Sequence, residues 1–141
     1  MLCKIYVCNK HRFPERIEFS NISRSGIACQ KYTADPLCET GSSIRLRSGV
    51  SVMLGGFHVQ SNFDSIFTPF LIMHGTSDKI SDIKGSEAMV KNAMSSDKSL
   101  VRMEGVFHEV YEDPDRGMFM WVIYIYVERE RERDSVTRTI Y

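Results

Sequence analysis

Two side chains with complementary acid–base chemistry, Asp78 and His108, each follow a segment with the pattern of a buried β-strand. Asp78 comes shortly after an apolar run that ends near Gly75, and His108 comes shortly after Gly105. Because catalytic groups collect at the carboxyl ends of parallel strands, we expect both side chains at one edge of a sheet. There an aspartate can orient an imidazole, which takes a proton from an attacking hydroxyl and returns it to the leaving alcohol. An acid followed along the chain by a histidine supplies two members of a Ser–acid–His triad.

The stretch around these residues has the pattern of one strand–helix–strand unit, the repeating piece of a parallel sheet. Residues 67–73 form a short apolar run typical of a buried strand, and residues 99–103 predict the next strand. Ser81 or Asp82 can cap a helix between the two strands. The apolar residues on one face of that helix are Ile83, Met89, Val90, Ala93 and Met94. The sequence therefore predicts the α/β fold class.

Several segments in this region also resemble a known family. They are residues 70–79, 95–100 and 103–108. Their sequence, order and spacing are similar to the C-terminal third of the monoacylglycerol lipases, serine hydrolases of the α/β-hydrolase superfamily. The most specific pieces are His-Gly-Thr-Ser-Asp, which ends at Asp78, and Glu-Gly-x-x-His, which ends at His108. The resemblance covers about residues 31 to 118, and it implies that Asp78 is the triad acid and His108 the triad base.

The resemblance implies a reaction and a substrate class. Enzymes of this family hydrolyse the carboxylic ester of monoacylglycerols or lysophospholipids without a cofactor or metal, and contact between the complete enzyme and a membrane surface would bring it to such lipids. Ile80 and Ser81, in the turn after Asp78, are the candidates to line the substrate pocket. Glu109 departs from the family, in which a small or apolar residue is more usual beside the base. A carboxylate in contact with His108 would raise the pKa of that imidazole.

The third member of a triad has no candidate of the required form. A nucleophile elbow has the pattern Gly-x-Ser-x-Gly, because only small residues fit beside the strained serine. Around Ser51 the chain reads Gly-Val-Ser-Val-Met, with Met53 where the second glycine belongs, and too short a stretch separates Ser51 from Asp78. The oxyanion hole needs the N–H after that serine and another from an earlier loop. We therefore expect a truncated, catalytically incomplete hydrolase, and the alternative is a non-catalytic remnant that acts as an interaction module.

The chain is expected to comprise four segments. They are an unmatched segment at 1–30, the end of a cap region at 31–66, the segment with acid and histidine at 67–118, and an apolar, then charged, low-complexity tail at 119–141. Residues 44–56 are ambiguous, because the alternation at 44–47 favours a strand whereas the resemblance implies a cap helix. The apolar run 118–127 is too short for a transmembrane helix, which needs about 20 residues. Its β-branched and aromatic residues predict self-association of the fragment.

The amino-acid composition argues against a nucleic-acid-binding protein. The chain has 141 residues with 18 basic and 18 acidic side chains, so its formal net charge of zero gives no electrostatic footprint for nucleic acid. An α/β-hydrolase needs a longer chain, which is a further reason to expect truncation. Charged residues interrupt every apolar run near the N-terminus, so a signal peptide is not predicted and a cytoplasmic location is expected. The resemblance adds the expectation that the protein can associate with a membrane surface.

The cysteines and two further histidines are not expected to bind a metal or to take part in catalysis. The four cysteines are Cys3, Cys8, Cys29 and Cys38. We expect them to be reduced thiols, because their spacing, even with His11 added, lacks the paired ligand doublets of a zinc site. His58 and His74 are interpreted as structural, since the sequence pairs neither with a second ligand or a nucleophile.

Overall fold

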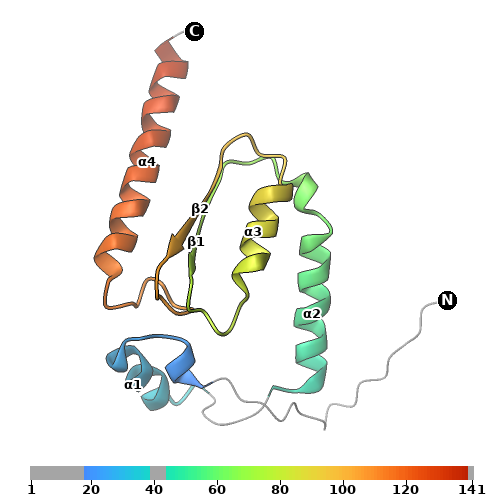
Figure 1. Ribbon diagram of the computed structural model, residues 1–141, viewed down its shortest axis with the longest axis vertical. Helices are drawn as coiled ribbons and strands as arrows, with labels where there is room; N and C mark the ends of the chain where they lie inside the picture. Colours follow the sequence, from blue (N-terminus) through green and yellow to red (C-terminus); the bar gives the residue numbers. More distant parts are fainter. Residues whose placement is uncertain (1–17, 39–43, 140–141) are drawn as a thin grey trace, which may run out of the picture.

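The computed structural model describes residues 18–38 and 44–139, apart from the side chains of 134–139. Two parallel strands lie at its centre, with helices on both sides (Figure 1). The elements in chain order are η1 (Phe19–Asn21), α1 (Gly26–Ala34), α2 (Leu46–Gln60), η2 (Phe63–Ser65), β1 (Phe70–Gly75), α3 (Ile83–Asn92), β2 (Lys98–Met103) and α4 (Arg116–Thr139). The pattern of strand, helix and parallel strand confirms the predicted α/β class.

The two strands are in parallel register from the Phe70–Lys98 pair to the Gly75–Met103 pair. The second strand lies within one residue of its prediction, whereas the first begins three residues later than expected and runs two residues further. Pro69 lacks an N–H and cannot donate to a ladder, and the N–H of Phe70 makes the first bond, 3.1 Å to the carbonyl of Asp97. Both strands therefore end together, at Gly75 and Met103.

Helix α3 connects the strands and begins where a side chain caps it. Of the two predicted caps, Asp82 is the one observed, because its carboxylate accepts the N–H of Lys84 at 2.9 Å. Helix α3 lies on one side of the sheet and α4 on the other (Figure 1). The buried centre of this arrangement is the cluster Met103, Val106 and Val110, against which Met73, Val101 and Phe119 pack.

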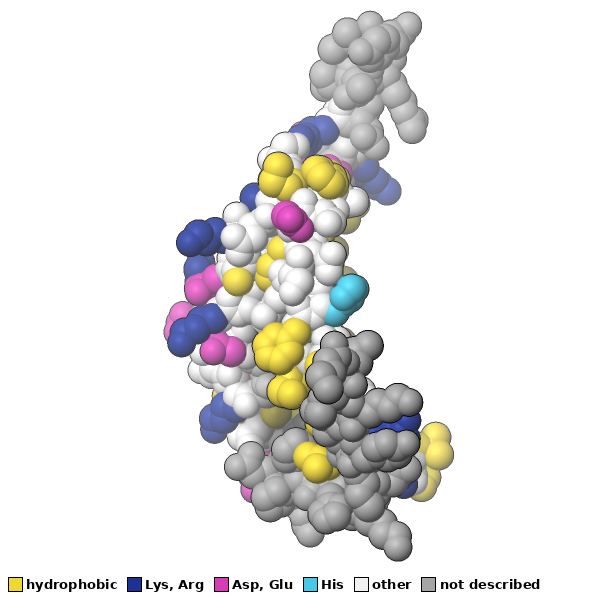
Figure 2. All heavy atoms as spheres, turned by 90° about the vertical axis from the view of Figure 1, so that its right-hand side faces the viewer, with side chains coloured by type: hydrophobic (Ala, Val, Ile, Leu, Met, Phe, Trp, Pro, Cys, Tyr) yellow, Lys and Arg dark blue, Asp and Glu magenta, His cyan; other side chains and the backbone are white. Residues whose placement is uncertain are grey.

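Helix α2 resolves the ambiguous stretch as a helix, so the strand interpretation is wrong from Leu46 onward. Many of its apolar side chains are exposed, among them Val52, Met53, Leu54, Phe57 and Val59. Figure 2 views the molecule from the side that carries α2, and hydrophobic side chains are visible on that surface. The side chain of Ser51 lies on the same helix and is exposed.

Helix α4 contains both the apolar run and the charged tract that follows it. The run is thus helical rather than extended, and any self-association has to come from the side chains that the helix exposes. Arg129 Nη2 lies 2.9 Å from Asp97 Oδ1, and Arg133 also pairs with Asp97, which ties the charged turns to the start of β2. None of the helices in the described ranges has the length and apolar character needed to cross a bilayer.

Candidate active site

The loops that follow β1 and β2 are joined to each other. Thr76 N–H donates to the carbonyl of Met103 at 3.0 Å, and Ser77 N–H donates to the carbonyl of Val106 at 3.0 Å. The close approach depends on Gly75, because a side chain there would overlap the carbonyl oxygens of residues 106 and 107. Gly105 turns the second loop with a φ of +70°, in the left-handed region that favours glycine. These contacts place the residues after the two strands on the same sheet edge.

Asp78 and His108 meet at this edge. His108 Nδ1 lies 2.9 Å from Asp78 Oδ2, and since an ionised carboxylate can only accept, the imidazole donates. The Asp78 side chain is 4% exposed and that of His108 is 42% exposed. The second ring nitrogen of His108, Nε2, is then the one available as a base. The structure therefore has the acid–imidazole geometry that the sequence pattern predicts for this pair.

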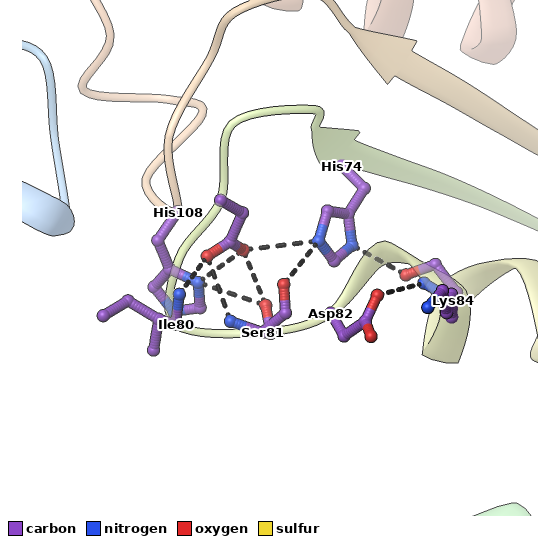
Figure 3. Close-up of polar contacts among 8 residues, drawn as sticks. His74, Ile80, Ser81, Asp82, Lys84 and His108 are labelled. Atoms are coloured by element: carbon purple, nitrogen blue, oxygen red, sulfur yellow. Dashed lines mark hydrogen bonds and ion pairs between the residues drawn. The ribbon is translucent and has the colours of Figure 1, made fainter.

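The turn after Asp78 wraps around its carboxylate. Asp78 Oδ1 accepts the N–H groups of Ile80 at 2.7 Å and Ser81 at 3.0 Å, and Oδ2 accepts the Ser81 hydroxyl at 2.6 Å (Figure 3). Ser81 Oγ also lies 3.3 Å from His108 Nδ1. Because that nitrogen carries the proton given to Asp78, it cannot act as a base toward Ser81. Ser81 therefore supports the acid and is not placed as a nucleophile.

These hydrogen bonds decide the charge of the acid. Burial alone would raise the pKa of Asp78, but hydrogen bonds from the Ser81 side chain, from His108 and from the N–H groups of Ser81 and Ile80 outweigh it and lower the pKa to about 2. Asp78 is consequently ionised at neutral pH, as an acid that orients a histidine must be.

His74, which the sequence gave no partner, contacts the same turn. It lies in β1, and its Nδ1 is 2.8 Å from Ser86 Oγ on α3. Its Nε2 is 3.2 Å from the carbonyl oxygen of Ser81 and 3.3 Å from Asp78 Oδ2. His74, which was interpreted as structural, thus lies beside the candidate site and contacts its acid. His58, by contrast, is exposed on α2.

Glu109 is engaged away from the imidazole. Its Oε1 accepts the hydroxyl of Tyr32, a residue of α1, and its N–H donates to the carbonyl of Ile22 at 2.9 Å. The hydrogen bond to Glu109, together with burial, raises the pKa of the Tyr32 hydroxyl. Glu109, the residue next to His108, thus connects this loop to Ile22 and to Tyr32 of α1.

An open cavity of about 380 Å³ lies beside the acid. Ile80 and Ser81, the predicted pocket residues, both line it, together with Gly75, Thr76, Asp78, Lys79, Asp82 and Ile83. A second open cavity, of about 620 Å³, is lined by Ser81, by Gln60 at the end of α2, by Phe63 of η2 and by residues along the length of α3. The described residues therefore leave space next to the Asp78–His108 pair.

The parallel strands, the crossover helix and the acid and histidine at one sheet edge define an α/β-hydrolase. Residues 3–115 match the family described as serine aminopeptidase, S33, and the chain belongs to that family. The match begins at residue 3, so it extends well before residue 31, where the resemblance was expected to start.

Cys3, Cys8 and His11 lie in the first part of the matched range, outside the described residues, whereas Cys29 and Cys38 are free thiols.

Individual relatives are monoacylglycerol lipases, which confirms the resemblance. The chain is 28% identical to the monoglyceride lipase of Rattus norvegicus over 99 residues, which are 70% of this chain and 32% of that protein. The monoacylglycerol lipase of Paleococcus ferrophilus superposes with a TM-score of 0.70 at 27% identity, covering 78% of this chain and 42% of that one. A soluble variant of Saccharomyces cerevisiae monoglyceride lipase, solved with a substrate analog, gives a TM-score of 0.70 at 21% identity over 86% of this chain and 44% of that one, and shows the fold alone. The chain thus spans about a third of the length of the rat relative.

Proposed function

We propose that these residues form the acid–base part of the active site of an ester hydrolase that acts on monoacylglycerols or lysophospholipids. The observation that carries the proposal is the 2.9 Å contact between Asp78 Oδ2 and His108 Nδ1 at the carboxyl ends of neighbouring parallel strands. The names of the relatives, monoglyceride and monoacylglycerol lipases, support the substrate class.

In this proposal Asp78 holds His108 in the tautomer with a proton on Nδ1. The free Nε2 takes the proton of a serine hydroxyl while the serine oxygen attacks the ester carbonyl, and it then returns the proton to the departing glycerol oxygen. Water hydrolyses the acyl-enzyme by the same steps. The ionised Asp78 stabilises the imidazolium that forms in each half of the cycle. Ile80 and Ser81 would face part of the substrate, because both line the cavity beside the acid.

In this proposal the nucleophile is supplied by residues other than these 141, because they contain no Gly-x-Ser-x-Gly. Ser51, the nearest sequence candidate, is exposed on α2 and not in a strand-to-helix turn. We therefore propose that a chain of these residues alone has no esterase activity. It should neither hydrolyse a monoacylglycerol or a nitrophenyl ester above an unfolded control nor react with a fluorophosphonate probe. Stoichiometric labelling of Ser51 would refute this.

A chimera tests the proposed function directly. The corresponding C-terminal part of the rat monoglyceride lipase is replaced by residues 70–116 of this chain, so that the rat protein supplies the rest of the site. We expect ester hydrolysis by the chimera, and a loss of about 10³-fold or more in kcat when His108→Ala or Asp78→Asn is introduced. Lys91→Ala, on an exposed position of α3, is the matched control and should leave the rate unchanged. A folded chimera whose activity is indifferent to both site variants would refute the proposal.

The alternative function is a non-catalytic interaction module, and one observation favours it. Within the described residues the sheet has two strands, so β1 pairs with β2 on one side only. The N–H and C=O groups of its other edge can pair with a strand of another chain. Sedimentation and thermal unfolding of the 141-residue chain distinguish the hydrolase fragment from the interaction module. A stable monomer with a cooperative thermal transition would favour the module.

A further inference from the structure

His74 contacts three parts of the site at once. It belongs to β1, its Nδ1 meets Ser86 of α3, and its Nε2 meets the turn that follows Asp78. Its side chain is 10% exposed. Figure 3 shows dashed contacts from its ring and from the ring of His108 to residues of this turn. Asp78 Oδ2 is within 3.3 Å of a ring nitrogen of each histidine, so the acid lies between them.

The partners of His74 fix its protonation. Nε2 faces two groups that can only accept, the carbonyl oxygen of Ser81 and the carboxylate of Asp78. A lone pair on Nε2 would be repelled by both, so this nitrogen carries a proton. Nδ1 faces the Ser86 hydroxyl, which can donate or accept. Nε2 therefore donates to the turn whether the ring is neutral or charged.

We propose that His74 is a positioning residue of this site, which holds the 78–81 turn and the Asp78 carboxylate in the orientation that receives His108. The bond to the Ser81 carbonyl fixes the residue whose N–H and hydroxyl both donate to Asp78. The contact at Oδ2 limits rotation of the carboxylate away from His108. His74 acts through Asp78 and does not touch the reacting atoms. This inference rests on the proposed function, because it concerns the same acid–base pair.

Two substitutions separate the donor from the bulk of the ring. In His74→Gln the amide nitrogen lies the same number of bonds from Cβ as Nε2 does, so it can donate to Ser81 and Asp78. His74→Leu keeps a side chain of comparable size without a donor. His58→Leu, on the exposed face of α2, is the matched control. The readout is two-bond ¹H–¹⁵N correlation NMR of the imidazoles in the 141-residue chain, which reports the tautomer of each neutral histidine.

In the unmodified chain, we expect His74 to carry its proton on Nε2 and His108 to carry its proton on Nδ1. In His74→Leu the Nδ1–H form of His108 should fall from the major to the minor tautomer, while His74→Gln and His58→Leu should retain it. An unchanged His108 tautomer in a folded His74→Leu protein would overturn the inference, as would a His74 proton on Nδ1 in the unmodified chain. If His108 lacks the Nδ1–H form even there, the proposed acid–base pairing itself fails.

Circular dichroism checks that each variant is folded. If His74→Leu does not fold, Ser86→Ala provides a second test, because it removes the partner of Nδ1 and leaves the imidazole in place. We expect Ser86→Ala to shift the His108 tautomer in the same direction by a smaller amount. If the His108 spectrum of the folded Ser86→Ala protein is identical to that of the unmodified chain, the inference is also overturned.

Discussion

Arg24 and Asp113 form a bidentate ion pair that joins the segment before α1 to the loop before α4. Arg24 Nε lies 2.8 Å from Asp113 Oδ2, and Arg24 Nη2 lies 2.5 Å from Asp113 Oδ1. The Asp113 side chain is 2% exposed, and the hydrogen bond from Arg24 lowers its pKa despite burial. The N–H of Glu109 donates to the carbonyl of Ile22, and the hydroxyl of Tyr32 in α1 donates to Glu109. Residues early in the chain therefore hold the loop that carries His108.

Replacing Arg24 by Ala should destabilise the protein by about 2 kcal/mol, because it leaves the buried Asp113 carboxylate without its main donor. Arg24→Lys should recover only part of the loss, since an ammonium cannot make both bonds. Asp115→Ala, which removes the other and 64% exposed partner of Arg24, should cost less than about 1 kcal/mol. Urea unfolding of the three variants measures these differences. Equal losses for Arg24→Ala and Asp115→Ala would contradict the assignment.

Gly75→Ala should be among the most damaging small substitutions in the chain. The added methyl group would overlap the backbone carbonyl oxygens of Val106 and Phe107, and backbone cannot move aside as a flexible side chain can. We expect a loss of at least about 3 kcal/mol in stability, with the 105–108 loop displaced. Gly85→Ala in α3 meets open space and should instead stabilise the helix by about 0.5 to 1 kcal/mol. Thermal melts of the two variants test the contrast.

The Asp78 carboxylate predicts an acid-dependent loss of stability. Its pKa falls from the ordinary 3.8 to about 2 on folding, so the folded state binds the proton more weakly than the unfolded state. The stabilisation is therefore complete above about pH 5 and disappears as the pH falls through about 2, and it amounts to about 2 kcal/mol. Urea unfolding of the wild type and of Asp78→Asn across this range should give curves that converge at low pH. Parallel curves would contradict the prediction.

Much of the site could be predicted because it depends on local pattern. Short apolar runs that stop at glycine mark the strand ends, and they predicted that Asp78 and His108 would lie on one edge. Asp82, the observed cap, was one of the two predicted candidates. A carboxylate just before an apolar helix face is a strong signal for the start of a helix. The ends of β1 were misplaced, since the apolar pattern continues through Phe67 while the hydrogen-bond ladder begins only after Pro69.

Contacts that depend on tertiary structure could not be predicted. Arg24 lies in a stretch without helical or strand period, and nothing in the sequence relates it to Asp113, 89 positions away. His74 was interpreted as structural because its partners lie in the following turn and on α3, which come together only in the fold. Its spacing of four from Asp78 in a segment that turns back on itself was the one local signal.

Self-association of the isolated chain should depend on the outer face of α4. The β-branched residues of the apolar run suggest Ile123 and Ile125 as sites where lysine would improve solubility, but Ile123 is half-buried and Ile125, although 43% exposed, also lines a cavity against the sheet. The most exposed apolar side chains of α4 are Met120, Trp121 and Tyr124, which are 59%, 64% and 61% exposed. Exposed apolar groups next to one another are unusual in a monomer and promote association.

We therefore expect Trp121→Lys combined with Tyr124→Lys to shift the chain from larger species toward monomer in sedimentation velocity, without lowering the melting temperature. Val122→Lys is the matched control. Val122 faces Leu71 and Val101 across the cavity between α4 and the sheet, so a lysine there should destabilise the fold and increase association. A sharp melt and a monomeric boundary for the unmodified chain would show that the exposed face of α4 does not drive association, and would strengthen the case for a self-sufficient interaction module.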